Sequence, residues 1–145
     1  MTIKELSRLY HLQEEIKDCA KQLKQLEEQR GISAMNLDGM PHAKGGHTSP
    51  TEQLAEEIVD LEAIIMAKQL QSIHERNRLE RYIKDIANPK MRRIFEYRFA
   101  QCMPWSKVAE KMGAGYTPSS VRQSCSRYIR DDNKEQTVTH VTRST

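Results

Sequence analysis

The fold is decided by residues 104–130, which read PWSKVAEKMGAGYTPSSVRQSCSRYIR. Apolar residues recur at helical spacing on both sides of the glycine-containing segment 113–116, which predicts two short helices joined by a turn. Thr117 followed by Pro118 is a start signal for the second helix, because threonine caps free amides and proline fits the first turn. Two helices joined in this way are typical of a helix-turn-helix.

The second of these helices is expected to present a polar outer side. Proline at its start leaves first-turn amides free to approach a phosphate, towards which the helix dipole also points. Arginine can bind guanine through two hydrogen bonds and glutamine can do the same with adenine, so Arg122 and Gln123 are the leading candidates for base contacts. The complete set of candidate base-reading residues is Ser119, Ser120, Arg122, Gln123 and Ser126.

Other polar and cationic residues near these helices suit DNA phosphates, which fix position without reading sequence. Residues 88–130 contain nine basic and two acidic side chains, a net +7, whereas the whole chain carries only +3. Such a concentration of positive charge attracts a polyanion and favours double-stranded DNA as the partner. The candidate phosphate ligands are Arg92, Arg93, Lys107, Lys111, Thr117, Arg127 and Arg130.

The residues before this region predict two long helices. From about residue 2 to residue 30, apolar residues recur every three or four positions, and Gly31 then supplies a stop. Residues 31–49 have glycines, a proline and no sustained period, so a loop is expected. Ser49 and Pro50 signal a second helix that should continue to residue 87. Folding one helix back on the other would bury both apolar seams, and a homodimer through the remaining surface of the long helices is a further expectation.

The chain is expected to divide at Asn88-Pro89, because proline lacks an amide donor and biases the preceding residue away from helix. Residues 1–87 would form a helical hairpin scaffold, and residues 88–130 a module with helices over about 89–101, 104–112 and 118–130. Periodicity is lost after Arg130, so residues 131–145 are expected to be a disordered tail. The predicted fold class is therefore all-α: a long antiparallel helical hairpin or coiled coil followed by a C-terminal trihelical helix-turn-helix module.

Three short runs carry a resemblance to known proteins: residues 89–99 (PKMRRIFEYRF), 105–113 (WSKVAEKMG) and 120–122 (SVR). Together they resemble the fourth region of bacterial sigma factors, which reads the promoter −35 element. The chain without its tail also resembles a family of uncharacterised phage and prophage proteins of Gram-positive bacteria, in which a Gly-Met-Pro-His segment, here Gly39-Met40-Pro41-His42, joins the two halves. The resemblance implies a sigma-like fold and a role in phage transcription, such as late-gene control.

Two features depart from the sigma-like pattern. The turn from Gly113 to Val121 is longer than the compact sigma-like version, and the chain has no counterpart of the sigma region that binds the −10 element. The resemblance therefore does not extend to promoter melting by this chain alone. Activation by recruiting polymerase and simple operator binding both stay open.

No pattern of residues predicts an enzyme, a metal site or a cofactor site. His42 and His47 lie in a glycine-rich segment, but no cysteine or carboxylate cluster completes the four ligands that zinc requires. Lys44 lacks the order of residues that a phosphate-binding loop needs, and no nucleophile, base and acid can be placed together on rigid elements. Catalytic, cofactor-binding and metal-binding residues are therefore all expected to be absent.

The cysteines and the hydropathy pattern indicate a cytoplasmic protein without a membrane segment. Cys19, Cys102 and Cys125 are an odd number with no paired spacing, and no signal segment precedes them. The apolar run at residues 63–67 falls far short of the roughly 20 residues needed to cross a bilayer.

Two classes of function follow from these observations. The first is a sequence-specific DNA-binding transcriptional regulator of phage or prophage genes, with host RNA polymerase as a further partner. The alternative is a non-enzymatic assembly or adaptor protein, such as a DNA-packaging subunit or an RNA polymerase-binding factor, that works through the long helices. Arg122 and Gln123 favour the first class, because a purely structural role makes no use of their hydrogen-bonding side chains.

Overall fold

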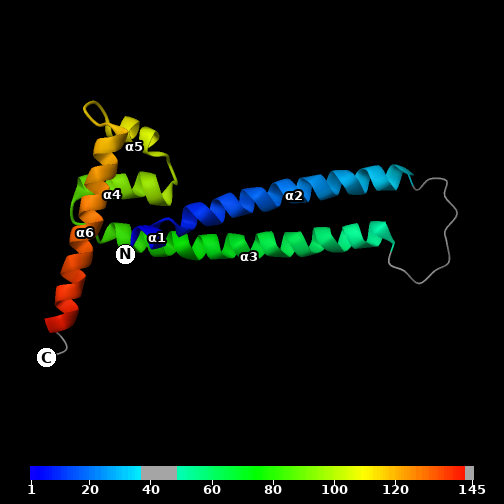
Figure 1. The fold of residues 1–145 in the computed structure, drawn as a ribbon, viewed down its shortest axis with the longest axis horizontal. Coiled ribbons are helices and arrows are strands. Elements are labelled where there is room, and N and C mark those ends of the chain that lie inside the picture. Colours follow the sequence, from blue (N-terminus) through cyan, green and yellow to red (C-terminus); the bar gives the residue numbers. More distant parts are fainter. Residues whose placement is uncertain (37–48, 143–145) are drawn as a thin grey trace. The chain divides into compact units, whose positions relative to one another are not determined.

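The computed structural model describes residues 1–36 and 49–142, and every regular element within these ranges is helical, which confirms the predicted all-α class. No helix in the described ranges is both long and apolar enough to cross a membrane. The predicted loop segment Gly39-Met40-Pro41-His42, Lys44 and His47 lie outside the described residues. The elements are α1 (Ile3–Leu6), α2 (Arg8–Asn36), α3 (Pro50–Lys84), α4 (Pro89–Phe95), the π-helix η1 (Glu96–Ala100), α5 (Trp105–Met112) and α6 (Pro118–Thr142) (Figure 1).

The chain forms two compact units. Unit 1 consists of Met1–His11 and Ile73–Thr145, and unit 2 consists of Leu12–Ser72. The predicted division at Asn88-Pro89 is therefore not where the compact units separate. Pro89 begins helix α4, and the hydrophobic core continues across this position.

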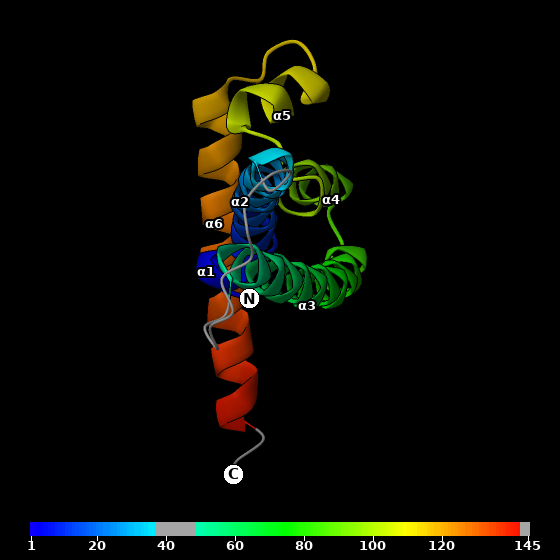
Figure 2. The same ribbon diagram turned by 90° about the vertical axis from the view of Figure 1, so that its right-hand side faces the viewer.

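The core of unit 1 gathers side chains from both ends of the chain. Leu6 and Leu9 are fully buried together with Leu79 of α3 and Phe95 of α4. The ring of Phe95 packs against those of Tyr82, Phe99 and Tyr128, with centroids 6.1, 5.2 and 5.5 Å away. α6 lies across α4 and α5 (Figures 1 and 2). These three elements also contribute the buried residues Met91, Ile94, Val108, Ala109, Val121, Cys125 and Ile129.

The N-terminal turn is tied to α3 by charged side chains. The Glu5 carboxylate accepts hydrogen bonds from the Thr2 amide at 2.8 Å and from the Arg78 guanidinium at 3.0 Å. The guanidinium of Arg8 lies 3.9 Å from the carboxylate of Glu75, which belongs to α3. The backbone bond from Thr2 and then the Arg78 contact lower the pKa of Glu5 from 4.5 to about 2. The first residues of the chain are thereby held against α3 within unit 1.

The first long helix differs from the prediction of residues 2–30 at both ends. It is interrupted at Ser7, and α2 continues through Gly31 to Asn36. Glycine in a helix costs only about 0.5–1 kcal/mol relative to alanine, and the α-carbon of Gly31 has open space around it. Nothing in its surroundings therefore forces the helix to stop there.

The second long helix ends at Lys84, earlier than the predicted residue 87. The amides of Asp85 and Ile86 bond to carbonyls only three residues back, which closes a tight turn. The start of the next helix at Asn88-Pro89 is confirmed, because the Asn88 side chain accepts hydrogen bonds from two amides of the first turn of α4.

The helix predicted over residues 89–101 changes into the π-helix η1 at Glu96. The wider turn places Phe99 and Ala100 in the core, each 5% exposed. Arg98 in η1 donates to the Met103 carbonyl at 2.9 Å, and its guanidinium lies 4.7 Å from the ring centroid of Trp105. These contacts hold the end of η1 to the start of α5.

The largest difference concerns the predicted disordered tail, because α6 continues from residue 131 to Thr142. The stretch after Pro118 contains neither glycine nor proline up to that point. Asp132 accepts a hydrogen bond from the Tyr82 hydroxyl at 2.9 Å, and burial together with this bond raises the pKa of Tyr82. Asn133 lies 3.4 Å from the Met1 ammonium group. Tertiary contacts therefore stabilise a segment whose own periodicity is weak.

Unit 2 consists of the adjoining parts of α2 and α3, which run in opposite directions (Figure 1). Ile58 is its most buried side chain among the described residues, at 4% exposed. Leu12, Ile16 and Leu23 are only partly buried. Lys68 and Glu15 form an ion pair between the two helices at 2.6 Å. The apolar seam that the sequence predicts is thus covered only in part.

Leu9→Ala tests whether the N-terminal residues belong to the core of unit 1. Leu9 is fully buried, so the substitution should lower the free energy of unfolding by about 2–5 kcal/mol. Ile32→Ala, at a side chain that is 62% exposed, is the control and should change it by less than about 0.5 kcal/mol. Urea unfolding followed by circular dichroism measures both values. Equal small changes would place the N-terminal segment outside the core.

Glu5→Gln tests the charged contacts of the N-terminal turn. The folded pKa of about 2 lies below the ordinary value of 4.5, so the contacts stabilise the native state above that ordinary value. This contribution is lost as the pH falls from about 4.5 to about 2. The wild-type protein should be the more stable of the two near neutral pH, and the difference in urea midpoint should shrink across that range. A difference that does not depend on pH would show that Glu5 acts through packing alone.

Candidate nucleic-acid interface

The outer side of the first half of α6 is polar and cationic. Val121, Cys125 and Ile129 are 1, 2 and 5% exposed and fix which side of the helix faces the core. Burial raises the pKa of the Cys125 thiol to about 12, so this side chain stays neutral there. The opposite side carries the exposed residues Ser119, Arg122, Gln123, Arg127 and Arg130, with Ser126 partly exposed. All of these except Ser119 line an open hollow of about 450 Å³.

The charged side chains in the first half of α6 all carry the same sign. Between Lys111 and Arg130 the sequence contains no acidic residue, so its charged side chains are all cationic. The sign reverses directly afterwards at Asp131 and Asp132. An anionic partner is therefore attracted to the first half of α6 and repelled from the turn that follows.

The turn before α6 depends on two glycines. Gly113 and Gly115 have φ angles of 105° and 89°. Residues with a side chain rarely adopt such positive φ angles, whereas glycine adopts them readily. Thr117 and Ser120 then cap the helix reciprocally: the Thr117 amide donates to Ser120 Oγ at 3.0 Å, and the Ser120 amide to Thr117 Oγ1 at 3.1 Å. Ser120 also donates its hydroxyl to the Thr117 carbonyl. Both side chains, predicted to contact DNA, are thus engaged in the cap.

α5 brings two of the predicted phosphate ligands to the surface. Lys107 is exposed, and its ammonium group lies 3.8 Å from Glu110 of the same helix. Such exposed ion pairs contribute little to stability, so a phosphate can replace the carboxylate at small cost. Lys111 is exposed at the end of α5, directly before the turn that leads into α6.

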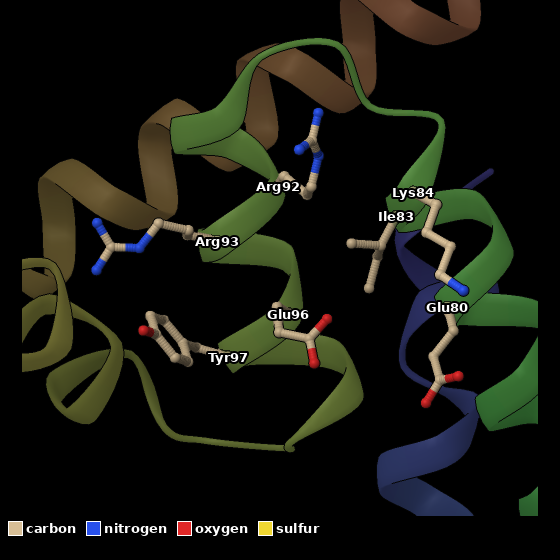
Figure 3. A pocket seen from close by; sticks show the side chains of 7 residues that line it. All are labelled: Glu80, Ile83, Lys84, Arg92, Arg93, Glu96 and Tyr97. Carbon is tan, nitrogen blue, oxygen red and sulfur yellow. The ribbon is translucent and has the colours of Figure 1, made fainter.

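Arg92 and Arg93 of α4 are placed differently from the other predicted phosphate ligands. Arg92 donates from Nε and Nη2 to the Ile86 carbonyl, at 3.1 and 2.9 Å. Nη2 of Arg93 lies 3.5 Å from the Lys111 carbonyl, and its guanidinium is 5.9 Å from the Tyr97 ring centroid. Both arginines line a separate hollow of about 350 Å³ between the end of α3 and the α4–η1 segment (Figure 3). The hollow is also lined by Glu80, Ile83, Lys84, Glu96 and Tyr97.

The sequence patterns did not identify two lysines that lie near the candidate interface, Lys90 and Lys134. The Lys90 ammonium lies 5.0 Å from the ring centroid of Tyr116, in the turn before α6, a proximity that only the tertiary fold creates. Lys134 is exposed and follows Arg130 by four residues and Arg127 by seven, so it continues the outer side of α6. It was missed because the sequence predicted a tail there, although the spacing of four and seven was already visible.

No group of three or more histidine, cysteine, aspartate or glutamate side chains in the described part of the chain could hold a metal ion. His42 and His47, the histidines considered for a metal site, lie outside that part.

Comparison with known proteins gave no match: no family model, no curated protein and no solved structure is similar to this chain.

Ser120→Ala separates capping from base contact. Loss of one partner in the helix cap should lower the free energy of unfolding by about 0.5–2 kcal/mol. Ser119→Ala, at an exposed neighbouring position, should change it by less than about 0.5 kcal/mol. Thermal and urea unfolding measure both. If Ser120→Ala leaves stability unchanged and instead alters the base preference of the protein, the assignment of Ser120 to the cap is wrong.

Proposed function

We propose that this protein is a sequence-specific DNA-binding regulator of phage or prophage transcription that places the first half of α6 in a major groove. One observation carries this proposal: Arg122, Gln123 and Arg127 stand exposed on a helix whose opposite side is fixed in the core. The major groove, about 12 Å wide, admits an α-helix. A helix fixed in this way holds its side chains in place before DNA arrives, which reduces the ordering cost of binding.

In this proposal the residues of α6 divide into two roles. Arg122 and Gln123 read base edges, because guanidinium and amide groups each form paired hydrogen bonds with a purine. Ser119 and Ser126, whose side chains are short, contact bases in the same groove where the helix comes close to them. Arg127 and Arg130 bind phosphates, which set the register of the helix on the duplex.

Lysines from α4, α5 and the later part of α6 add further phosphate contacts. Lys107 and Lys111 approach from α5, and Lys90 from α4 beside Tyr116. Lys134 continues the cationic side of α6 beyond Arg130, although Asp131 and Asp132 weaken the attraction at that point. Arg92 and Arg93 have no phosphate role in the proposal, because they line the hollow beside α3.

The transcriptional part of the proposal rests on the sigma-like sequence of the module. A chain with such a module but no counterpart of the region that binds the −10 element would act by recruiting host RNA polymerase or by occupying an operator. It would do so as a non-enzymatic cytoplasmic protein without a cofactor.

An adaptor function is the second candidate, and the hollow of Figure 3 favours it. Ile83 and Tyr97 supply apolar surface there, while Glu80, Lys84 and Glu96 provide charges of both signs around it. Such a surface suits an apolar side chain of a protein partner flanked by polar contacts. An adaptor would use this hollow, and its outer α6 surface would serve only to anchor it to DNA of any sequence.

Arg122→Ala and Lys111→Ala separate base contact from phosphate contact. Random duplexes are first selected with the full chain, and affinities for the selected and a scrambled duplex are then measured over a series of salt concentrations. Arg122→Ala should cost about 1–3 kcal/mol on the selected duplex and relax the preference at one base pair. Lys111→Ala should weaken both duplexes alike and lower the salt slope by about one.

Arg76→Ala is the matched control, since Arg76 is exposed on α3 and lies outside the candidate interface. It should leave the affinity and the salt slope unchanged. Equal affinity of the wild-type protein for selected and scrambled duplexes would exclude sequence-specific regulation and favour the adaptor.

A further inference from the structure

A small pocket lies where the N-terminal segment meets η1, and the residues that line it all belong to unit 1. Its volume is about 150 Å³. Leu6 and Phe99, which are 0 and 5% exposed, supply apolar walls. The other described lining residues are polar or cationic, and none of them is acidic: Ser7, Tyr10, His11 and Arg98. A lining of this kind favours a small anionic ligand.

The backbone is irregular on both sides of the pocket. Ser7 interrupts the helix between α1 and α2, and Arg98 and Phe99 belong to the π-helix η1. A single π-helical turn is rare and is frequently found at functional sites. A pocket lined by two such irregularities is therefore a stronger candidate for a ligand site than a hollow between regular helices.

Arg98 is held in position beside this pocket. Its Nη1 donates to the Met103 carbonyl at 2.9 Å, and its guanidinium lies 4.7 Å from the ring centroid of Trp105. This bond uses one N–H donor of the guanidinium and leaves the others for a ligand. No ion pair in the described part of the chain includes Arg98. Glu96, the acidic residue of η1, lines the other hollow. The positive charge of Arg98 is thus fixed in place without a carboxylate to neutralise it.

Three further polar groups line the pocket from the other side. The side chains of Ser7, Tyr10 and His11 form no hydrogen bond with any other described residue. A hydroxyl and an imidazole can each donate a hydrogen bond to an anion. These donors lie at the start of α2, whereas Arg98 belongs to η1. A ligand in the pocket would therefore be bound from two sides.

We propose that this pocket binds a small tetrahedral oxyanion of the phosphate type, with Arg98 as its charged ligand and Ser7, Tyr10 and His11 as hydrogen-bond donors. A water molecule occupies roughly 30 Å³ in the liquid, so the pocket holds about five heavy atoms, the size of inorganic phosphate. A guanidinium binds phosphate oxygens in pairs, and the remaining oxygens point towards donors on the opposite side. A nucleotide is too large for this volume.

The oxyanion would join the beginning of the chain to the segment that holds the start of α5, because Arg98 also contacts Met103 and Trp105. A ligand that binds only the folded protein stabilises it. The proposal does not rest on the function proposed for α6, because the residues of the α6 hollow do not line this pocket.

An NMR titration of the full chain with inorganic phosphate, at an ionic strength held constant with chloride, tests the proposal. The amide shifts of Ser7, His11 and Arg98 should change together and saturate, with a dissociation constant on the order of 1 mM. Acetate should bind about 10-fold more weakly, because it has fewer oxygens to accept hydrogen bonds.

Two pocket variants and one control identify the ligands. Arg98→Gln should weaken phosphate binding about 10- to 100-fold, because the charge-assisted bonds are lost. Tyr10→Phe removes one neutral donor from an exposed side chain and should weaken binding about 2- to 10-fold. Arg81→Gln removes the same charge as Arg98→Gln at an exposed position of α3 outside the pocket, and should leave phosphate binding unchanged.

Shifts that do not saturate, or that saturate only at the arginines of α6, would overturn the proposal. Acetate binding as tight as phosphate binding would exclude a tetrahedral oxyanion as the ligand. If Arg98→Gln does not fold, as judged by circular dichroism, Tyr10→Phe combined with Ser7→Ala decides the matter. An affinity of that double variant equal to the wild-type value would likewise overturn the proposal.

Discussion

The packing of aromatic and aliphatic side chains around Phe95 is the constraint on which the candidate interface depends. Phe95 is fully buried, and the rings of Phe99 and Tyr128 meet it edge-on. Tyr128 belongs to α6, so this contact fixes the rotation of that helix about its own axis. With Val121 and Cys125 held inward, Arg122 and Gln123 have only the outer side available. The function proposed for α6 is therefore a consequence of hydrophobic burial on its opposite side.

Much of the fold could be predicted where local signals and packing agree. A capping residue followed by proline predicted three helix starts, at Ser49-Pro50, Asn88-Pro89 and Thr117-Pro118. A helix begins at each of these prolines. The glycines at 113 and 115 marked the turn correctly, because their positive φ angles require residues of that kind. Periodicity then identified the inward side of α6, and with it the outward one.

The differences arise where distant parts of the chain decide local structure. Gly31 does not stop α2, since one glycine is too weak a signal in a long helix. The extension of α6 past Arg130 is held by Tyr82 and Met1, which no window of sequence around Asp132 contains. The same limit applies to Lys90, which approaches Tyr116 only in the tertiary structure. Arg92 was assigned to phosphate from its charge alone, whereas its geometry directs it to the Ile86 carbonyl.

Two surfaces of the chain thus have separate uses in this account: the outer side of α6 for DNA, and the hollow beside Arg92 and Arg93 for a protein partner in the alternative. Backbone NMR chemical shifts of the full chain during titration with a selected duplex test the central claim most directly. The account predicts the largest changes at residues 119–134 and around Lys111. Changes confined to the hollow between α3 and η1, with α6 unaffected, would contradict it.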